Sequence, residues 1–544
     1  MGWRQYNARA PMSDSMDASQ ANRQIARAAA TVMFAIAVGQ LLGLLRGMLV
    51  ARTFPAMELD AFFAANRVSE TLFMLIAAGA LGSAFIPKFT GMLAQGERAP
   101  AWQLASSLAN LILLILSGAS VLAAVFAPAI VRYLLAPGFS SDASLFGLTV
   151  ELLRLQLTSV VFFGLGGLLV GVLNAHQVFL VPALTPSMYQ LGLIFGALVL
   201  APSQGIRGLA WGVVIGACLY LLLQIPSLYR IAVEARVGRR IPYWASLGLQ
   251  DPSVLEVLRL MLPRVIGIGV VQLNFWVNTW LASRMQTGSV AGLQYGFSLM
   301  LMAQAVIAQS AAIAAMPTFS AQHATGRLGD LRGSIAATIR GVLLLAVPAS
   351  AGLMLLRQPI VSLLYQRGQF DAAMTELVAW ALLWFAAGLI GHSILEVLTR
   401  AFYAQHDTRT PVIVGASAMA LNIALSLALA AGFTRIGWMP HGGLALANSL
   451  ATALEAAGLF ILLRRRIGLA EDRTISQAML QALAGTAALC LVVWPLSRLA
   501  FPVWIITIGG ITMGAAAYFL VLKQLGVQEL SALLDWVDRR LTRR

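Results

Sequence analysis

The candidate functional residues of this sequence are polar side chains inside long apolar stretches. Arg46 is the most informative of them, because it lies well within the run AIAVGQLLGLLRGMLVA. An ionised side chain near the centre of a bilayer costs about 2.5–3.5 kcal/mol on insertion scales, so such a residue usually lines a cavity. Arg46 is therefore a candidate ligand for an anion. Snorkelling to the membrane surface, or pairing with Glu70, is the alternative.

Acidic and basic residues of the next apolar stretch extend this candidate site. Arg67 and Glu70 are three residues apart and share a helical face. They form either an ion pair that only orients the helix or a pair that contacts a ligand. Asp60 opens the run DAFFAANRV. This position favours an ordinary helix N-cap, with a contact to a cation or to Arg46 as the alternative.

Polar residues of later helices complete the site. Asn274 and Asn278 lie four residues apart, in the helix that corresponds to the one holding Arg46. They line a cavity or join two helices by hydrogen bonds, and the sequence leaves both interpretations open. The substrate-binding residues that we predict are Gln40, Arg46, Asp60, Arg67, Glu70, Asn274, Asn278, Gln294 and Ser298.

Other intramembrane polar residues have structural interpretations. Glu396 and Arg400 are four residues apart and are expected to form an ion pair near a helix end. His392 stands alone on an apolar face, and we expect a neighbouring helix to satisfy it. Arg154 is expected to snorkel to the membrane surface.

Motifs for several kinds of chemistry are absent from the sequence. It contains no G-x-x-x-x-G-K-[ST] loop for nucleotide, no HExxH and no GxSxG. Its two cysteines, Cys218 and Cys490, fall inside apolar runs and give neither a disulfide framework nor a metal-binding spacing. We therefore predict no metal, no cofactor and no catalytic residue, which favours a transporter over an enzyme.

The elements that must position these residues are membrane-spanning helices. Of the 544 residues, 59% are hydrophobic and only 11% are charged, and the mean hydropathy is +0.80. Soluble domains carry about 25% charged residues, so a soluble enzyme of several domains is excluded. Hydropathy predicts about fourteen helices, at 28–53, 61–87, 103–130, 150–173, 181–201, 208–230, 256–283, 290–316, 334–356, 374–400, 410–431, 441–463, 475–497 and 502–523.

The basic residues set the predicted topology. The formal net charge is +15, from 37 Lys and Arg against 22 Asp and Glu. About 23 basic residues fall on the side of the termini and about 8 on the other side, so the positive-inside rule predicts cytoplasmic termini. The first apolar run is too long for a signal peptide and is expected to remain as a helix. Most of the positive charge therefore serves to orient the helices in the membrane, and we expect no nucleic-acid partner.

An internal repeat relates the two halves of the chain. Pro87 and Gly138 match Pro317 and Gly368, each 230 residues later. Ordered matches at one offset predict a duplicated six-helix lobe, with the two lobes in the same orientation, as in alternating-access transporters. The predicted segments are a cytoplasmic N-terminal segment (1–27), an N-lobe (28–230), a cytoplasmic linker (231–255), a C-lobe (256–466), two further helices (475–524) and a cytoplasmic tail (525–544).

Several stretches at their expected separations carry a family resemblance. They are GQLLGLLRGMLVARTFP, LDAFFAANRV, GALGSAFIPKFT, APGF, RGQFD and AFYAQHDTRTPV. Over about residues 28–525 the chain resembles the lipid II flippase family (MurJ/MviN) of the multidrug/oligosaccharidyl-lipid/polysaccharide exporter superfamily. The resemblance implies two six-helix lobes around a central cavity, and two extra helices that form a groove for a lipid tail. It also implies the bacterial cytoplasmic membrane as the location.

The resemblance extends to some of the site residues but not to all. Arg46 matches the family's second arginine of the first helix, Asp60 matches its acidic residue at the start of the second helix, and Arg67 falls where a basic residue is usual. Four departures stand where the family has charged residues: Gln40 and Phe73 replace arginines, Phe297 with Ser298 replaces an Asp-Arg pair, and Ala78 replaces a glutamate.

The function implied by the resemblance is transport of lipid II. The substrate would be undecaprenyl pyrophosphate carrying a disaccharide-pentapeptide, moved from the inner to the outer leaflet for cell wall synthesis. We expect alternating access around a cavity lined by the first, second, seventh and eighth helices. The alternatives are a flippase for another lipid-linked oligosaccharide, a drug exporter of the same superfamily, and a non-transporting scaffold that recruits cell wall synthesis proteins.

Overall fold

A polypeptide inside a bilayer must satisfy its backbone hydrogen bonds internally, and helices do this within one segment. The computed structural model describes residues 18–75, 81–234, 243–468, 472–499 and 501–527, and these residues contain helices and no strand. The predicted terminal segments lie mostly outside these described residues, and the predicted linker lies partly outside them. The all-helical fold class is confirmed.

The first half of the described chain forms ten α-helices joined by short helical turns. They are α1 (Ala18–Thr53), α2 (Ala56–Phe73), α3 (Leu81–Ala94), α4 (Arg98–Val125), α5 (Ala127–Ala129), η2 (Ile130–Leu135), η3 (Pro137–Ser141), α6 (Ala143–Ala175), α7 (Leu180–Phe195), η4 (Gly196–Leu200), α8 (Ala201–Gln204), α9 (Ile206–Leu222) and α10 (Ile225–Glu234).

The second half of the described chain contains eleven α-helices, of which α20 and α21 have no counterpart in the first half. Its elements are α11 (Pro252–Ala282), α12 (Ser289–Gln304), η5 (Ala305–Gln309), α13 (Ser310–Ala324), α14 (Leu328–Leu355), α15 (Arg357–Tyr365), α16 (Ala372–Ala387), α17 (Leu389–Ala404), α18 (Arg409–Arg435), α19 (His441–Ile467), α20 (Asp472–Leu496) and α21 (Val503–Gln524).

The membrane-spanning segments match the hydropathy prediction in position. In the described part of the chain, ten helical segments are long and apolar enough to cross a membrane, and α16 with α17, bent by 48°, makes an eleventh. The other three predicted spans coincide with α1, with α2 plus α3, and with α11, which fall outside that count. The total of fourteen stays a prediction.

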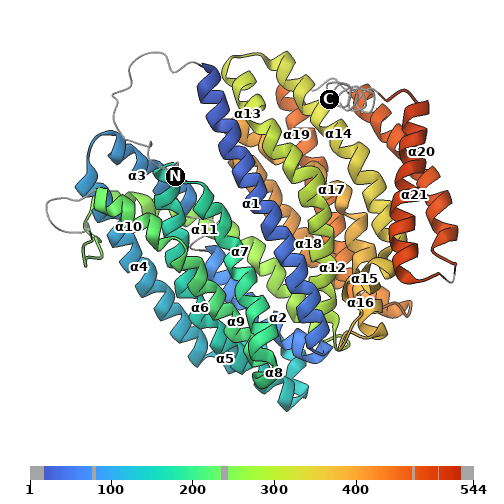
Figure 1. Ribbon diagram of the computed structural model, residues 1–544, viewed down its shortest axis with the longest axis horizontal. Helices are drawn as coiled ribbons and strands as arrows, with labels where there is room; N and C mark the ends of the chain where they lie inside the picture. The colour runs from blue at the N-terminus through green and yellow to red at the C-terminus, as the bar shows by residue number, and fades with distance from the viewer. Residues whose placement is uncertain (1–17, 76–80, 235–242, 469–471, 500, 528–544) are drawn as a thin grey trace, which may run out of the picture.

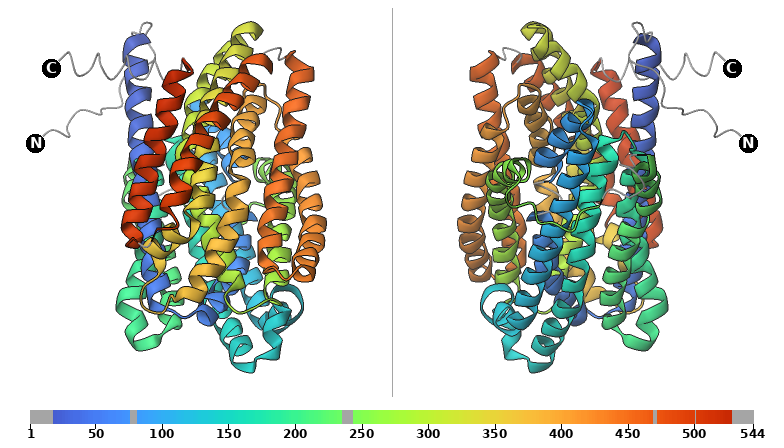
Figure 2. Two further views of the ribbon diagram at one scale, coloured as in Figure 1. Left: turned by 90° about the vertical axis from the view of Figure 1, so that its right-hand side faces the viewer. Right: turned by 90° about the vertical axis from the view of Figure 1, so that its left-hand side faces the viewer.

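The internal repeat recurs in the helix boundaries. α4 and α14 cover residues 98–125 and 328–355, and α3 and α13 end at residues 94 and 324, each pair 230 residues apart. The two repeats form the N-lobe and the C-lobe. In Figure 1, α1 runs between the helices of the N-lobe and those of the C-lobe, and α20 and α21 lie at the right-hand edge. α20 packs on α14 and on α21. Figure 2 shows the long helices running in a common direction.

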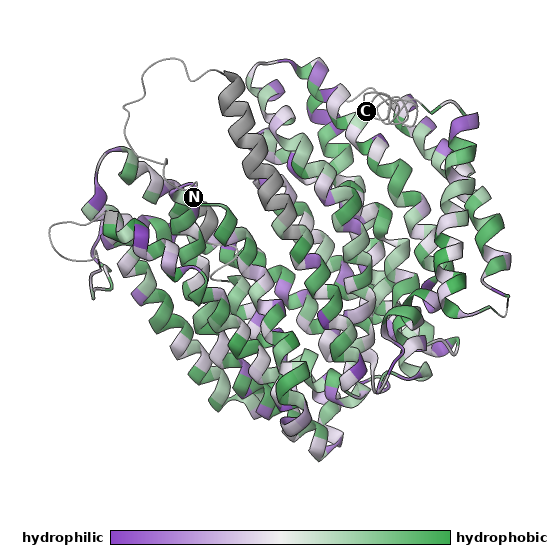
Figure 3. Ribbon diagram, in the orientation of Figure 1, coloured by the Kyte–Doolittle hydropathy of each residue, from purple (hydrophilic) through white to green (hydrophobic). Residues whose placement is uncertain are grey.

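The outer surface is apolar, as a bilayer requires. Hydrophobic residues cover most of the bundle in Figure 3, with hydrophilic segments at many helix ends. Large apolar side chains point outward from the middle of helices, including Leu114 on α4 and Leu491 on α20, which is 77% exposed. An apolar surface of this extent is stable in lipid rather than in water.

Glycines allow α7 and α9 to pack closely. Gly192 and Gly196 face Gly208, Gly212 and Gly216, and a Cβ on Gly192 would lie 2.7 Å from the Gly212 carbonyl oxygen. Small residues at four-residue spacing let membrane helices bring their backbones into contact. This contact fixes the adjacent side chains of α7 and α9, two of which reach the cavity described below.

The turn AQHDTRT between α17 and α18 is fixed by Asp407. Its carboxylate accepts hydrogen bonds from the Thr410 amide and hydroxyl, at 3.0 and 2.7 Å, and from Arg466 at 2.5 Å. These bonds, led by that of the Thr410 amide, lower the pKa of Asp407 to about 2. The ionised carboxylate thus joins the turn to the end of α19.

Two segments related by the repeat each cross to the other lobe at one end of the bundle, which we call the α1–α2 end. Gly138 in η3 lies against the end of α11, and its amide donates to Ser283 Oγ at 3.2 Å. Gly368, after α15, lies against the end of α1, and the neighbouring Gln369 amide donates to the Arg52 carbonyl at 3.0 Å. We call residues 136–141 and 366–370 the crossing loops.

Only glycine fits at both contact points. A Cβ on Gly138 would collide with the Ser283 carbonyl and lie 2.8 Å from Arg284 Cα. A Cβ on Gly368 would lie 2.9 Å from Arg52 Cγ, and this residue has a φ of +64°, which other residues rarely adopt. The repeat therefore preserves two equivalent contacts that hold the lobes together at the α1–α2 end.

Replacing the first of these glycines tests this contact. Gly138→Ala is expected to lower the free energy of unfolding by about 1–3 kcal/mol, because the added methyl group overpacks the contact. Thermal unfolding of the purified protein in detergent measures the change. The control is Gly341→Ala in α14, where a new Cβ meets open space. Equal Tm values for both variants would show that the crossing loops contribute no stability.

Candidate functional site

A cavity of about 330 Å³ opens between the two lobes. α1, α2, α6, α7 and α9 supply its N-lobe wall, and α12 supplies its C-lobe wall. The expectation that the first, second, seventh and eighth helices line the cavity is only partly met. The lining residues are Arg46, Gly47, Val50, Phe62, Phe63, Asn66, Arg67, Ser69, Glu70, Phe73, Met74, Ser159, Phe163, Tyr189, Leu193, Val213, Gln294 and Tyr295.

Arg46 lies on the wall of this cavity. It is partly buried and makes no hydrogen bond or ion pair with any residue that the structure describes. Pairing with Glu70, one of its alternative interpretations, does not occur, because Glu70 pairs with Arg67. The next residue, Gly47, faces Tyr365 and Tyr295 of the C-lobe, so this part of α1 lies at the junction of the lobes. The guanidinium of Arg46 is thus free to bind an anion.

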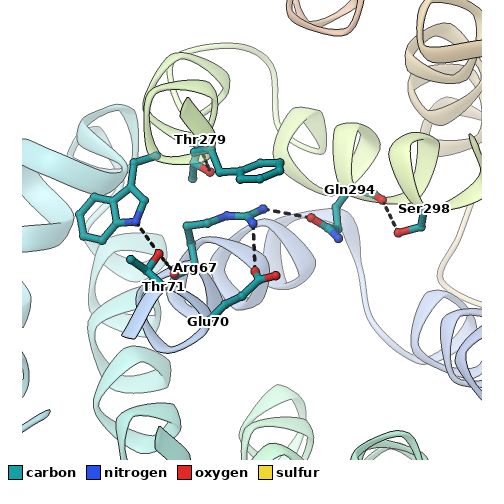
Figure 4. A network of polar contacts seen from close by, with 8 residues as sticks. Arg67, Glu70, Thr71, Thr279, Gln294 and Ser298 are labelled. Carbon is teal, nitrogen blue, oxygen red and sulfur yellow. Dashed lines mark hydrogen bonds and ion pairs between the residues drawn. The ribbon is translucent and has the colours of Figure 1, made fainter. Parts of the chain in front are cut away.

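Arg67 joins the two lobes across the cavity. Its Nη1 lies 2.9 Å from Glu70 Oε2, and its Nη2 donates to Gln294 Oε1 on α12 at 3.1 Å (Figure 4). Its Cζ also lies 4.9 Å from the ring centroid of Phe275 on α11, a cation–π contact. The predicted ion pair is therefore present, and it contacts the C-lobe through Arg67.

A second contact between the lobes surrounds this pair. Trp276 Nε1 donates to Thr71 Oγ1 at 2.8 Å, and Thr71 in turn donates to the Arg67 carbonyl (Figure 4). Ser298 donates to the Gln294 carbonyl in its own helix at 2.7 Å and does not line the cavity. Gln40 also lies outside the lining and is exposed on α1.

A smaller cavity of about 50 Å³ adjoins the first one on the C-lobe side. Arg67 and Gln294 line both cavities, while Asn278 lines only the smaller one. The larger cavity therefore adjoins a smaller, mainly apolar pocket of the C-lobe, and Arg67 lies at the boundary between them.

The paired asparagines of α11 join this helix to α18. Asn274 is buried and accepts hydrogen bonds from Asn278 and Asn422, both at 3.3 Å. Asn278 accepts one from Ser426 at 3.2 Å. Asn274 therefore joins two helices by hydrogen bonds. Asn278 does so too and also lines the smaller cavity.

The interpretation of Asp60 as the N-cap of its own helix is wrong. α2 begins at Ala56 with Pro55 as its N-cap, so Asp60 lies inside the helix. Its carboxylate is 2% exposed and accepts hydrogen bonds from the Gly288 amide at 2.6 Å and the Ala291 amide at 2.8 Å. Asp60 thus caps α12, a helix of the other lobe, where backbone amides favour a negative charge. It contacts neither Arg46 nor the cavity.

The aromatic and hydroxyl residues of the cavity were not predicted from the sequence. Phe163 on α6 packs against Phe73 and Tyr189, with ring centroids 5.2 and 5.4 Å apart. The side-chain oxygens of Ser69 and Tyr295 are buried without a hydrogen-bond partner among the described residues, as is Arg67 Nε. Such buried polar atoms are rare. They point to a polar ligand or water, and no sequence pattern distinguished these residues from core residues.

Charged residues outside the cavity behave as structural groups. His392 Nε2 lies 3.1 Å from Asn448 Oδ1 on α19, which confirms that a neighbouring helix satisfies it. Arg400 pairs with Glu396 at 2.6 Å, as expected. Arg154 is bonded to the Ala124 carbonyl at 3.0 Å. None of these residues lines the large cavity.

An apolar cavity of about 310 Å³ lies against the last two helices. Leu353 and Leu356 contribute from the C-lobe, and Val493, Gly510 and Ala515 from α20 and α21. It is separate from the arginine-bearing cavity and shares none of its lining residues. Its lining suits a hydrocarbon chain.

The arginine-bearing cavity is suited to binding an anion. Two guanidiniums and one carboxylate line it, together with aromatic rings and unpaired hydroxyls. Guanidiniums bind phosphate through charge-assisted hydrogen bonds, which strengthen where water is excluded. Among the described residues, no group of three His, Cys, Asp or Glu side chains is placed to hold a metal ion.

One family of known proteins matches this chain over most of its length. The sequence profile of the family described as Lipid II flippase MurJ matches residues 50–510. The lipid II flippase MurJ of Burkholderia cenocepacia is 30% identical over 446 residues, covering 81% of this chain and 84% of the relative. A probable lipid II flippase MurJ of Vibrio cholerae is 30% identical over 515 residues, covering 90% of this chain and 94% of the relative.

Solved structures show the same fold. Lipid II flippase MurJ in an inward closed conformation has a TM-score of 0.75 at 23% identity, covering 92% of this chain and 99% of the other. An inward-facing multidrug resistance MATE family transporter of the MOP superfamily has a TM-score of 0.66 at 14% identity, covering 80% of this chain and 98% of the other. Both likenesses are likenesses of fold.

Removing the Asp60 carboxylate tests its contact between the lobes. Asp60→Ala is expected to lower the free energy of unfolding by about 2–3 kcal/mol, because two buried amides lose their acceptor. Asp142→Ala is the control, since Asp142 accepts from the Ser144 and Leu145 amides at the exposed start of α6. That variant should lose about 1 kcal/mol. Equal losses in thermal unfolding would argue against a special role for Asp60.

Proposed function

The chain belongs to the lipid II flippase MurJ family, and we propose that it moves lipid II from the inner to the outer leaflet of the bacterial cytoplasmic membrane. It is a multi-pass membrane protein of the transporter class rather than an enzyme. The single observation that carries the proposal is Arg46, an arginine inside the bundle that faces a cavity between the lobes and lacks a partner among the described residues. The pyrophosphate of lipid II supplies the missing anion.

Arg46 binds the pyrophosphate, and Arg67 assists it. Both guanidiniums line the same cavity, and Arg67 keeps a buried Nε without a partner among the described residues. Charge-assisted hydrogen bonds to phosphate are about twice as strong as neutral ones. Gln294 and Asn278, on the walls of the two adjoining cavities, meet the sugar and peptide groups of the headgroup. Asn274 acts by holding Asn278 in position.

Transport proceeds by alternating access between the lobes. The crossing loops and Asp60 hold the lobes together at the α1–α2 end, which we assign to the outer face because the positive-inside rule places the termini in the cytoplasm. The headgroup enters from the cytoplasmic leaflet. These contacts must separate before it can leave on the outer side, where cell wall synthesis proteins consume it.

The apolar cavity beside α20 and α21 holds part of the polyprenyl chain. Its lining is almost entirely hydrocarbon, and it includes side chains from the C-lobe and from both extra helices. Burying each CH₂ group of a lipid contributes about 0.8 kcal/mol. The lipid tail therefore adds affinity without entering the polar cavity.

A flippase for another lipid-linked oligosaccharide is the second candidate. The specific observation in its favour is Phe73, which lines the cavity where an arginine is expected from the family resemblance. An aromatic ring packs against a sugar face rather than a phosphate. Both candidates require Arg46 for a lipid-linked phosphate, and they differ in the glycan that the protein accepts.

A depletion experiment tests the lipid II function. In a bacterium depleted of its own lipid II flippase, this protein is expected to restore growth and lipid II exposure on the outer leaflet. Arg46→Ala should reduce that exposure at least about tenfold, since it removes charge-assisted bonds to the pyrophosphate. The control is Arg154→Ala, which removes an arginine outside the cavity. Absence of rescue by well-expressed wild-type protein would favour the other glycan.

A bulky residue tests the proposed tail site. Ala515→Trp fills the apolar cavity and is expected to weaken lipid II binding about tenfold, because displacing two CH₂ groups costs about 1.6 kcal/mol. Ile508→Trp is the control, since Ile508 lies on the same helix, is exposed and does not line the cavity. Equal dissociation constants for the two variants in nanodiscs would refute this location of the tail.

A further inference from the structure

Glu70 occupies one anion-binding position of Arg67. Its Oε2 lies 2.9 Å from Arg67 Nη1. The Arg67 side chain is 13% exposed, whereas that of Glu70 is 38% exposed and reaches the open part of the cavity. The carboxylate thus makes, from within the protein, the same kind of contact that a phosphate oxygen would make.

The other contacts of Arg67 are neutral. Its Nη2 donates to the amide oxygen of Gln294, and its Cζ lies over the ring of Phe275. Among the described residues that line the cavity, Glu70 is the one carboxylate beside two arginines. It is therefore the group that balances the charge of Arg67, while Arg46 remains without an ion pair among the described residues.

An alternating-access carrier has to return with its cavity empty. A guanidinium without a counter-charge is costly in a low-dielectric interior, so an unpaired Arg67 would oppose closure of the empty cavity. Gln294 and Phe275 belong to the C-lobe, and their contacts with Arg67 cross the junction of the lobes. Any anion that draws Arg67 away from them also loosens that junction.

We propose that Glu70 is the resident counter-ion of Arg67: it neutralises Arg67 in the empty cavity, and the substrate phosphate displaces it. This inference rests on the proposed flippase function and adds a role in the return step. Glu70 weakens substrate binding because it competes with the phosphate, and it speeds turnover because it stabilises the empty, closed cavity. A merely structural ion pair would support both binding and turnover.

The test measures binding and turnover separately for Glu70→Gln. Purified protein in liposomes is assayed for lipid II affinity and for the rate constant of flipping under multiple turnover. The variant is expected to bind lipid II about tenfold more tightly, because Glu70 no longer competes with the phosphate for Arg67. It is expected to flip lipid II about tenfold more slowly, because the unpaired Arg67 opposes closure of the empty cavity. The double variant Arg67→Gln with Glu70→Gln removes both charges and should recover part of the turnover rate.

Glu396→Gln is the matched control, because Glu396 pairs with Arg400 inside the membrane but outside the cavity. Its affinity and rate should stay within about twofold of wild type. Weaker binding by a folded Glu70→Gln variant, or an unchanged affinity and rate, overturns the counter-ion role of Glu70 and leaves the proposed flippase function standing. Wild-type protein that neither binds nor flips lipid II overturns the proposed function, so the two failures are distinguishable.

Discussion

The cost of keeping a guanidinium inside a bilayer is the constraint on which the rest of this structure depends. Arg46 and Arg67 lie within the helical bundle, and the protein surrounds them with a cavity rather than with lipid. Arg67 is compensated by Glu70, by Gln294 and by the face of Phe275. Arg46 has no such compensation among the described residues, and in the proposed function an anionic headgroup supplies it.

The two lobes are joined by contacts that have to be reversible. At the α1–α2 end, Asp60 accepts two amides from the start of α12, and the crossing loops place Gly138 and Gly368 against the opposite lobe. Apolar residues of both lobes pack around these polar contacts, as Phe63 and Tyr295 do with ring centroids 5.6 Å apart. The repeat supplies two crossing loops in equivalent positions, and the proposed alternating access requires the lobes to separate there.

Intramembrane charge predicted the charged residues that line the cavity, while the contacts between the lobes were beyond the sequence. Arg46 was predictable because one arginine inside a long apolar run is costly, and Arg67 with Glu70 because of their three-residue spacing. The partner of Asp60 lies more than two hundred residues away, in the other lobe, and no local pattern indicates it. Likewise Phe163 and Tyr189 resemble ordinary core residues, since an apolar helix looks the same whether it faces a cavity or a neighbour.

The most direct measurement of the central claim is a structure of the full chain in nanodiscs with lipid II bound. The account predicts that the pyrophosphate lies in the cavity between the lobes, with a phosphate oxygen about 3 Å from the Arg46 guanidinium. It also predicts that Glu70 has moved away from Arg67. A headgroup bound elsewhere, or a cavity in which Arg46 contacts no phosphate, would contradict the account.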